Sequence, residues 1–337
     1  MATFLVTGGA GFIGSHLVET ALAQGHRVLA LDDLSSGSVY NLAGVRSNPR
    51  FEFTPEAVES SRVLAELVDQ ADVIFHLAAT VGVFNIIDSP VQTIENNIGG
   101  TEAVLKAAAK KKKKVLVAST SEVYGKSAAT PFREDGDLTL GPTSKSRWSY
   151  AASKIVDEFL AQAYWKQHKV PTVTLRFFNT IGPRQTGRYG MVAPRFIKQA
   201  LEGQNLTVYG TGRQSRCFTC VTDVVTWLLK LADNDAAVGG VYNLGNPEEV
   251  TITELAQRVI QLTGAKAGID YVPYEAVYEE GFEDMERRVP DISKIVALTG
   301  YAPQVKLDET LRMTRDWFIA NEASQVVQTQ EPVLASR

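Results

Sequence analysis

A tyrosine and a lysine four residues apart are the side chains in this chain best suited to proton transfer. Tyr150 and Lys154 lie in a stretch predicted to be helical, so both side chains should fall on one face. An ammonium beside a phenol lowers the phenol pKa, and the phenolate can then take a proton from a hydroxyl near neutral pH. Ser119, Thr120 and Ser121 follow the apolar run KVLVA, and one of these hydroxyls could hydrogen-bond the reacting oxygen.

Three glycines stand where the first apolar run passes into the first predicted helix. Gly8, Gly11 and Gly14 form the pattern G-x-x-G-x-x-G, which lets the backbone approach a pyrophosphate closely and leaves N–H groups at the helix start to bind its charge. Asp32 ends the second apolar run, where a carboxylate can accept hydrogen bonds from ribose hydroxyls and would repel a 2′-phosphate. These features predict a dinucleotide site that prefers NAD to NADP.

Strands and helices alternate along the first half of the chain. Strands are predicted at 2–7, 27–33, 51–54, 72–79, 114–120 and 172–178, with helices at 12–24, 60–70, 91–109 and 149–168 between them. This alternation predicts an α/β fold in which residues 1–180 form a Rossmann-type, doubly wound parallel sheet. Turn-rich segments then indicate a smaller C-terminal α/β region over 181–320, with strands near 213–246 returning to the sheet. Residues 321–337 are polar and are predicted to form a flexible tail.

Composition excludes several classes of protein. The chain has 337 residues, and 34 Lys and Arg against 38 Asp and Glu give no electrostatic reason to bind nucleic acid. No apolar run approaches the roughly 18–20 residues of a membrane helix, and the first residues do not resemble a signal peptide, so a cytoplasmic location is expected. The basic run Lys110 to Lys114 is predicted to be a solvated helix end. Cys217 and Cys220 lack a second ligand pair, so we predict reduced structural thiols and no metal site.

The glycine pattern followed by Tyr150 and Lys154 resembles the extended short-chain dehydrogenase/reductase family, specifically its NAD-dependent nucleotide-sugar epimerases, dehydratases and decarboxylases. The similarity covers about residues 2–320, and it implies a Thr120, Tyr150 and Lys154 triad, a nucleotide sugar held by the C-terminal region, and a homodimer formed by the helices near 91–109 and 149–168. The implied cofactor residues are Gly8, Gly11, Phe12, Ile13, Gly14, Asp32, Leu77, Ala78, Ala79, Asn97, Tyr150 and Lys154. The implied substrate residues are Ser121, Asn179, Arg184, Val208, Tyr209, Arg216 and Arg288, whose arginines suit a diphosphate.

One segment departs from the family pattern. Many relatives carry Gly-Asp-Val after the third strand, with the aspartate bonding adenine, whereas this chain has Glu56, Ala57 and Val58. The resemblance therefore leaves the recognition of adenine without its usual carboxylate.

The stretch Thr120-Ser121-Glu122 discriminates among the family's reactions. Sugar 4,6-dehydratases carry Thr-Asp-Glu, so dehydration is disfavoured. Thr-Ser-Glu and the segment RWSYAASK resemble UDP-glucuronate decarboxylases, in which Glu122 would manage a proton at C5 and Arg288 would orient the carboxylate; Glu122 could instead simply bond loop amides. The segments GPRQTGRYGMVAPRF and AATVGVFN resemble UDP-glucose and UDP-glucuronate 4-epimerases at least as well. We expect a UDP-glucuronate decarboxylase, with a 4-epimerase as the open alternative, and we disfavour a non-enzymatic NAD-binding regulator because Tyr150 and Lys154 are both present.

Overall fold

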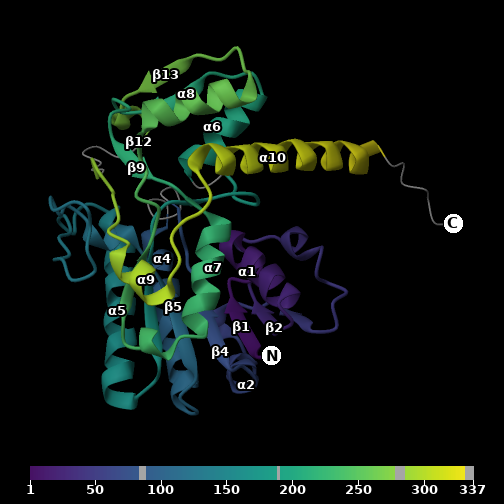
Figure 1. Ribbon diagram of the computed structural model, residues 1–337, viewed down its shortest axis with the longest axis vertical. Coiled ribbons are helices and arrows are strands. Elements are labelled where there is room, and N and C mark those ends of the chain that lie inside the picture. Colours follow the sequence, from purple (N-terminus) through teal and green to yellow (C-terminus); the bar gives the residue numbers. More distant parts are fainter. Residues whose placement is uncertain (83–88, 188–189, 278–284, 331–337) are drawn as a thin grey trace.

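A parallel sheet of seven strands forms the centre of the larger part of the molecule (Figure 1). The computed structural model describes residues 1–82, 89–187, 190–277 and 285–330, the last nine of these as backbone alone. The strand order is β11-β6-β5-β4-β1-β2-β3, and every pairing within the sheet is parallel. The strands are β1 (Thr3–Thr7), β2 (Arg27–Leu31), β3 (Phe51–Thr54), β4 (Val73–His76), β5 (Lys114–Thr120), β6 (Thr172–Phe177) and β11 (Val241–Leu244).

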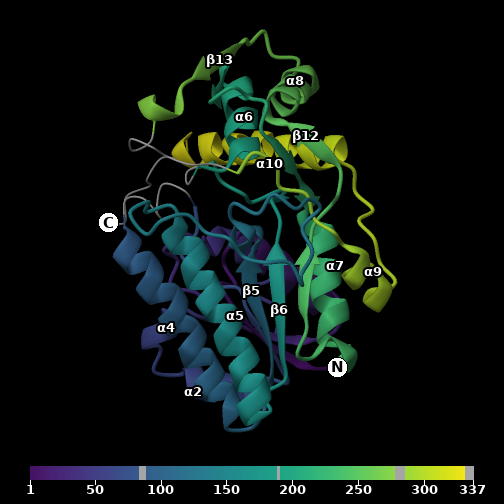
Figure 2. The same ribbon diagram turned by 90° about the vertical axis from the view of Figure 1, so that its left-hand side faces the viewer.

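Helices cover both faces of this sheet, which confirms the predicted doubly wound fold. One face packs against α1 (Phe12–Ala23), α7 (Val221–Ala232) and α9 (Ser293–Thr299), and the other against α2 (Leu64–Gln70), α4 (Pro90–Ala109) and α5 (Trp148–His168). Figure 2 shows α4 and α5 side by side on the outer layer. Because the strand order reverses between β1 and β4, a crevice opens at their carboxyl ends, where such sheets bind ligands.

The smaller region lies above the carboxyl ends of the sheet and has a core of its own (Figure 2). Its elements are α6 (Val192–Leu201), β8 (Leu206–Tyr209), β9 (Ser215–Cys217), β12 (Glu249–Thr251), α8 (Ile252–Thr263), β13 (Ile269–Val272) and α10 (Leu307–Gln330). Short strands β7 (Thr180–Ile181) and β10 (Thr219–Cys220) pair where the two regions join. Single 3-10 turns are η1 (Val39–Leu42), η2 (Val58–Ser60), η3 (Ser121–Tyr124), η4 (Asp235–Ala237) and η5 (Tyr274–Ala276).

Two predictions for the C-terminal half of the chain need correction: which strands join the large sheet, and where the last helix ends. Of the strands within 213–246, β11 joins the large sheet, but β9 pairs with β12 and β10 with β7. Residues 321–330 continue helix α10 and do not form a tail, and residues 331–337 lie outside the described residues. Figure 1 shows α10 extending beyond the body of the C-terminal region. No helix among the described residues is both long and apolar enough to cross a membrane.

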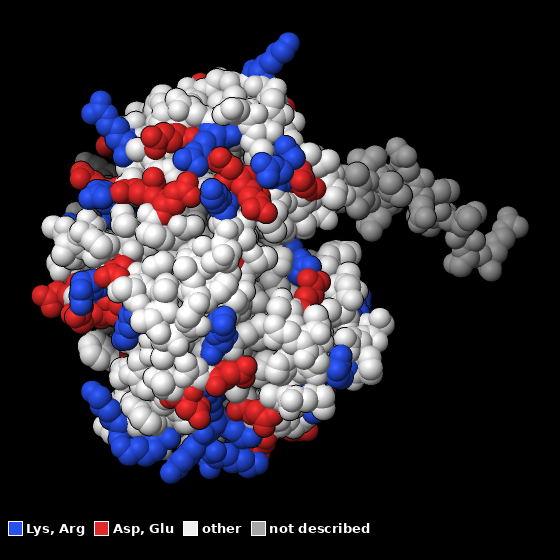
Figure 3. Space-filling model, viewed as in Figure 1, with Lys and Arg blue, Asp and Glu red and all other residues white. Residues whose placement is uncertain are grey.

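The basic run is split between a turn and a strand. Lys110 to Lys113 follow α4 and precede β5 at the amino-terminal edge of the sheet. Basic side chains gather at the lower end of the face shown in Figure 3. Lys114 instead begins β5 and is buried, so the prediction of a solvated residue is wrong for it. Its ammonium donates to the carbonyl oxygens of Ala232 at 2.8 Å and Asn234 at 3.0 Å, which satisfies acceptors at the end of α7.

The two cysteines are buried and are not joined in a disulfide. Burial raises the pKa of the Cys217 thiol to about 12, so this thiol stays protonated and unreactive near neutral pH. The Cys220 sulfur lies 3.1 Å from the Thr222 hydroxyl.

Candidate active site

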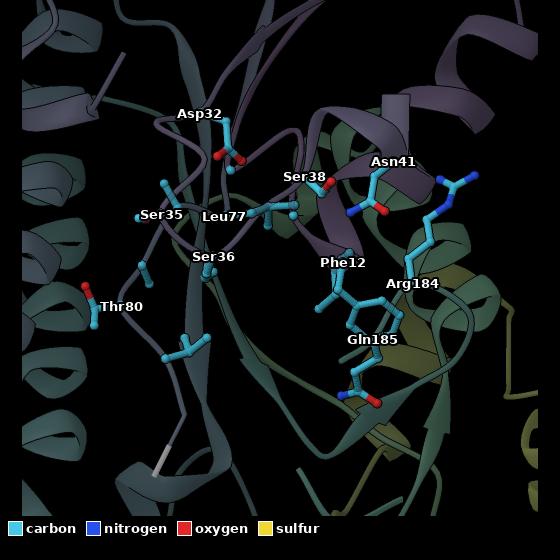
Figure 4. Close-up of a pocket in the computed structure, with 18 of the residues that line it drawn as sticks. Phe12, Asp32, Ser35, Ser36, Ser38, Asn41, Leu77, Thr80, Arg184 and Gln185 are labelled. Atoms are coloured by element: carbon cyan, nitrogen blue, oxygen red, sulfur yellow. The ribbon is translucent and has the colours of Figure 1, made fainter. Parts of the chain in front are cut away.

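A cavity of about 1080 Å³ opens at the carboxyl ends of β1, β2, β4 and β5 (Figure 4). The loops that follow these strands form its walls, as the reversed strand order requires. All the predicted cofactor residues except Asn97 line it: Gly8, Gly11, Phe12, Ile13, Gly14, Asp32, Leu77, Ala78, Ala79, Tyr150 and Lys154.

The glycine turn is too tightly packed for side chains. Gly8 has a φ of +71°, and a Cβ placed on Gly14 would lie 2.0 Å from the Gly8 carbonyl oxygen. The backbone at the start of α1 therefore stays bare along the cavity wall, as a pyrophosphate requires.

Asp32 lines the cavity on the side away from Asn41 and Arg184, as Figure 4 shows. Its carboxylate accepts hydrogen bonds from the N–H groups of Ala10 at 2.9 Å and Leu34 at 2.8 Å, which fixes its orientation at the end of β2. Burial raises the pKa of Asp32, and these two hydrogen bonds oppose the rise. A fixed carboxylate beside a bare glycine turn fits the ribose and pyrophosphate of NAD.

Replacing Gly14 with alanine should weaken NAD binding at least about tenfold, because the new methyl group must displace the Gly8 carbonyl. Isothermal titration calorimetry with NAD measures this change. Gly99→Ala is the matched control, since a Cβ there meets only the Glu59 Cβ at 3.9 Å and should leave the affinity unchanged. Equal affinities of the two variants for NAD would refute the assignment of the glycine turn.

Asn97 is buried and is not among the described residues that line the cavity. Its side-chain oxygen accepts from the Thr80 N–H at 2.8 Å, and its amide nitrogen donates to the Ser153 hydroxyl at 3.1 Å. Asn97 thus ties the loop after β4 to helix α5, and the neighbouring Asn96 is the residue of this pair that lines the cavity.

The adenosine end of the cavity includes residues that sequence reasoning missed. Glu56, Ala57 and Val58 line it, but the Glu56 carboxylate also accepts from the Ser61 hydroxyl at 2.8 Å and the Arg62 N–H at 3.0 Å. Further lining residues come from segments that carry no periodic signal: Ser35, Ser36, Ser38, Tyr40, Asn41 and Thr80.

Tyr150, Lys154 and Thr120 converge at the inner end of the cavity. Tyr150 lies in the first turn of α5, Lys154 one turn later, and Thr120 at the last position of β5. Burial and the nearby Glu122 carboxylate raise the pKa of Tyr150, while a hydrogen bond with Thr120 opposes the rise. The pKa of Tyr150 is thus raised overall, and the Lys154 ammonium lies 2.6 Å from the Asp157 carboxylate.

A second cavity of about 360 Å³ adjoins the first and shares Phe12, Thr120 and Tyr150 with it. It lies between the sheet edge and the C-terminal region. The predicted residues that line it are Ser121, Glu122, Asn179, Tyr209, Arg216 and Arg288. The Arg288 guanidinium lies 3.6 Å from the Glu122 carboxylate, and both side chains are largely buried.

Two predicted substrate residues lie elsewhere. Val208 is fully buried in the core of the C-terminal region, because side chains alternate along β8 and Tyr209 takes the cavity face. Arg184 lines the first cavity and donates to the Glu19 carboxylate at 2.7 Å, so it joins the 180–187 segment to α1.

The second cavity is strongly cationic. Among the described residues that line it, four are arginines and one, Glu122, is acidic. Sequence reasoning missed Arg147 and Arg195, although Arg147 precedes Tyr150 by three residues in the quoted segment RWSY. The Arg195 guanidinium lies 4.0 Å from the centroid of the Tyr209 ring. Such a cavity fits a ligand with several negative charges.

Comparison with known proteins agrees with this geometry. Residues 4–245 match the model of the NAD dependent epimerase/dehydratase family. The chain belongs to this family. NAD is the cofactor that the family uses, and the chain is accordingly an NAD-dependent enzyme that modifies nucleotide sugars.

The chain is similar to decarboxylases and a 4-epimerase that act on UDP-linked sugar acids. The chain is 43% identical to the UDP-N-acetyl-alpha-D-glucosaminuronate decarboxylase of Bacillus cytotoxicus, over 93% of this chain and 97% of that protein. It is 37% identical to UDP-glucuronic acid decarboxylase 1 of Danio rerio, over 93% of this chain and 72% of that protein. The UDP-glucuronic acid 4-epimerase of Bacillus cereus, solved with UDP-glucuronic acid and NAD, superposes with a TM-score of 0.85 at 31% identity, covering 95% of this chain and 99% of that one.

Proposed function

We propose that this enzyme decarboxylates a UDP-hexuronate, with UDP-glucuronate as the first candidate substrate and its 2-acetamido analogue as the second. The observation that carries the proposal is the buried Glu122–Arg288 pair beside Tyr150, in a cavity with four arginines. A UDP-hexuronate has a diphosphate and a carboxylate, and these anions need fixed cations. The decarboxylases of Bacillus cytotoxicus and Danio rerio, similar over most of this chain, support the same reaction.

Oxidation at C4 of the sugar begins the proposed mechanism. NAD, when bound, supplies a hydride acceptor for C4 and later a hydride donor. The glycine turn and Asp32 would hold it, and Tyr150 takes the proton of the C4 hydroxyl. Thr120, which hydrogen-bonds the Tyr150 phenol, stabilises the charge that develops on the reacting oxygen.

Loss of CO₂ follows from the chemistry of the oxidised sugar. A 4-keto-hexuronate is a β-keto acid, so the electrons of the breaking C5–C6 bond pass into the ketone and give an enolate. Arg288 orients the sugar carboxylate before this step. Glu122 then directs the protonation of the enolate at C5. Tyr150 then returns its proton to the C4 oxygen, and with hydride delivered to C4 the product would be a UDP-pentose.

A 4-epimerase is the second candidate, favoured by the 31% identity to the UDP-glucuronic acid 4-epimerase of Bacillus cereus. It would share the oxidation step and then return the hydride to the other face of an intact 4-keto-hexuronate. The two functions differ in whether C6 leaves the sugar.

The proposal is tested by incubating the enzyme with NAD and UDP-glucuronate, and separately with UDP-N-acetylglucosaminuronate. Proton NMR of the anomeric region follows the products over time. A UDP-pentose from either substrate supports decarboxylation and identifies the preferred sugar from the ratio of kcat/KM values. UDP-galacturonate from UDP-glucuronate would establish the 4-epimerase, and no change in either sugar would refute both functions.

We further propose that the enzyme works in the cytoplasm as a homodimer. Reduced thiols at Cys217 and Cys220 suit that compartment. Helices α4 and α5 pack against each other and expose apolar side chains that a second copy would cover, namely Val91, Ile94, Val156 and Phe159.

Phe159→Glu should convert this dimer to monomers, because Phe159 is 71% exposed and a charge there would be buried without a partner at the interface. Light scattering coupled to size-exclusion chromatography measures the mass. Ile319→Glu, on the exposed side of α10, should leave the wild-type mass unchanged. A wild-type mass near 36.7 kDa would refute the dimer.

A further inference from the structure

Asp157 is a buried carboxylate to which the proposed mechanism gives no role. It lies three residues after Lys154 on α5, and its carboxylate is 2.6 Å from the Lys154 ammonium. The two side chains are 0% and 2% exposed, respectively. A buried charge that loses its partner is strongly destabilising, so the two groups must be considered as one unit.

A chain of polar side chains connects this ion pair to the glycine turn. The Thr101 hydroxyl of α4 hydrogen-bonds the Asp157 carboxylate and lowers the pKa of Asp157. The same hydroxyl lies 3.2 Å from His76 Nε2. His76 Nδ1 lies 2.8 Å from the Thr7 hydroxyl, which also accepts from the Ala78 N–H in the cofactor cavity. Thr7, His76 and Thr101 are all buried.

His76 stays neutral within this chain of contacts. Burial and the Lys154 charge lower its pKa to about 3. A neutral imidazole that contacts a hydroxyl through each ring nitrogen links α4 to β1 and β4. The position of Asp157 is therefore fixed by elements that also form the cofactor cavity.

We propose that Asp157 is a positioning residue for the reaction: its carboxylate fixes the Lys154 ammonium and offsets part of its charge, so that Tyr150, Lys154 and Asp157 act as one unit. This inference rests on the proposed role of Tyr150 as the base. Burial and the charges of Glu122 and Asp157 raise the pKa of Tyr150, whereas Thr120 and Arg288 lower it.

Other charged groups near the unit are already paired. The Glu158 carboxylate, next along α5, accepts from Arg176 at 2.7 Å and 2.9 Å and from the Ser119 hydroxyl at 2.6 Å. Glu122 lies beside Arg288. Asp157 is thus the carboxylate that contacts the Lys154 ammonium directly.

The expected consequence is a displaced pH profile in Asp157→Asn. The base must be ionised to act, so activity rises with pH through the pKa of Tyr150. Removing a negative charge near the phenol lowers that pKa, and the acidic limb of kcat should move to lower pH by about one unit. The Asn variant keeps the shape of the side chain, so a merely structural role would change the rate without moving this limb.

The experiment measures kcat against pH for product formation by the wild type, Asp157→Asn and Glu158→Gln. Glu158→Gln removes a buried carboxylate from the same helix but not one that contacts Lys154, and its acidic limb should coincide with that of the wild type. Should Asp157→Asn fail to fold, Thr101→Val replaces it: the Thr101 hydrogen bond lowers the pKa of Asp157, so its loss weakens the negative charge near the phenol and should also move the limb to lower pH. An unmoved limb in the folded variant would overturn the proposal.

A second measurement separates failure of this inference from failure of the proposed function. Melting temperatures are compared for Lys154→Met, Asp157→Leu and the double variant, none of which requires turnover. Each single change should lower the melting temperature by at least about 5 °C, and the double variant should recover part of the loss because no charge remains unpaired. Additive losses would overturn the coupling even if decarboxylation is established, and recovery without turnover of either sugar would leave the unit standing while refuting the proposed function.

Discussion

Replacing Tyr150 with phenylalanine is expected to lower the rate of cofactor reduction by substrate at least about a thousandfold, because the base for the C4 hydroxyl is then missing. The aromatic ring remains, so the packing around this nearly buried side chain and the affinity for NAD should persist. Single-turnover absorbance at 340 nm, with UDP-glucuronate and excess NAD, measures the loss. Calorimetry with NAD alone confirms that the binding site is intact.

Tyr164→Phe is the matched control for this prediction. Tyr164 lies on the same helix, α5, but packs at its far end near His168 and lines neither cavity. Its variant should reduce the cofactor at the wild-type rate. A Tyr150→Phe variant that works as fast as the Tyr164→Phe variant would contradict the assignment of the base.

Glu122→Gln is expected to slow CO₂ release about a hundredfold while leaving oxidation at C4 nearly unchanged. The Glu122 carboxylate lies beside Arg288 in the second cavity, where the sugar acid would place its C5 and C6 atoms. Its charge also raises the pKa of Tyr150, so the neutral variant should not impair removal of the C4 proton. The 4-keto-hexuronate should therefore accumulate.

The partition between the two steps is measured by absorbance at 340 nm for oxidation and by trapped ¹⁴CO₂ for decarboxylation. Glu134→Gln is the control, since Glu134 accepts from the Asn243 N–H and lines neither cavity. Equal loss of both steps in Glu122→Gln would show that Glu122 only supports the loop at η3.

The alternation of apolar runs was sufficient to predict the sheet, because buried parallel strands and the helices between them have distinct lengths and periods. It failed where a single polar residue is buried through contacts that are distant in sequence. Lys114 is buried at the start of its predicted strand because its ammonium reaches carbonyl groups at the end of α7, more than a hundred residues away in sequence. Helix α10 continues past residue 320 although its polar composition carries no apolar period.

The site was predictable where a motif fixes the backbone, as at the glycine turn and Asp32. The sequence could not show which face of an element meets a cavity. Val208 and Tyr209 are neighbours in β8, and only the strand's orientation decides which one lines the substrate cavity. Asp157 carries no motif; its spacing of three residues from Lys154 allows a contact on one helix face, but the burial of the pair follows only when α5 packs against α4 and the sheet.

The most direct test of the central claim follows the fate of C6. UDP-glucuronate labelled with ¹³C at C6 is incubated with the enzyme and NAD, and ¹³C NMR records where the label goes. We predict that the label leaves the sugar and appears as CO₂ and bicarbonate while a UDP-pentose forms. Label retained at C6 of UDP-galacturonate would contradict decarboxylation and make the enzyme a 4-epimerase.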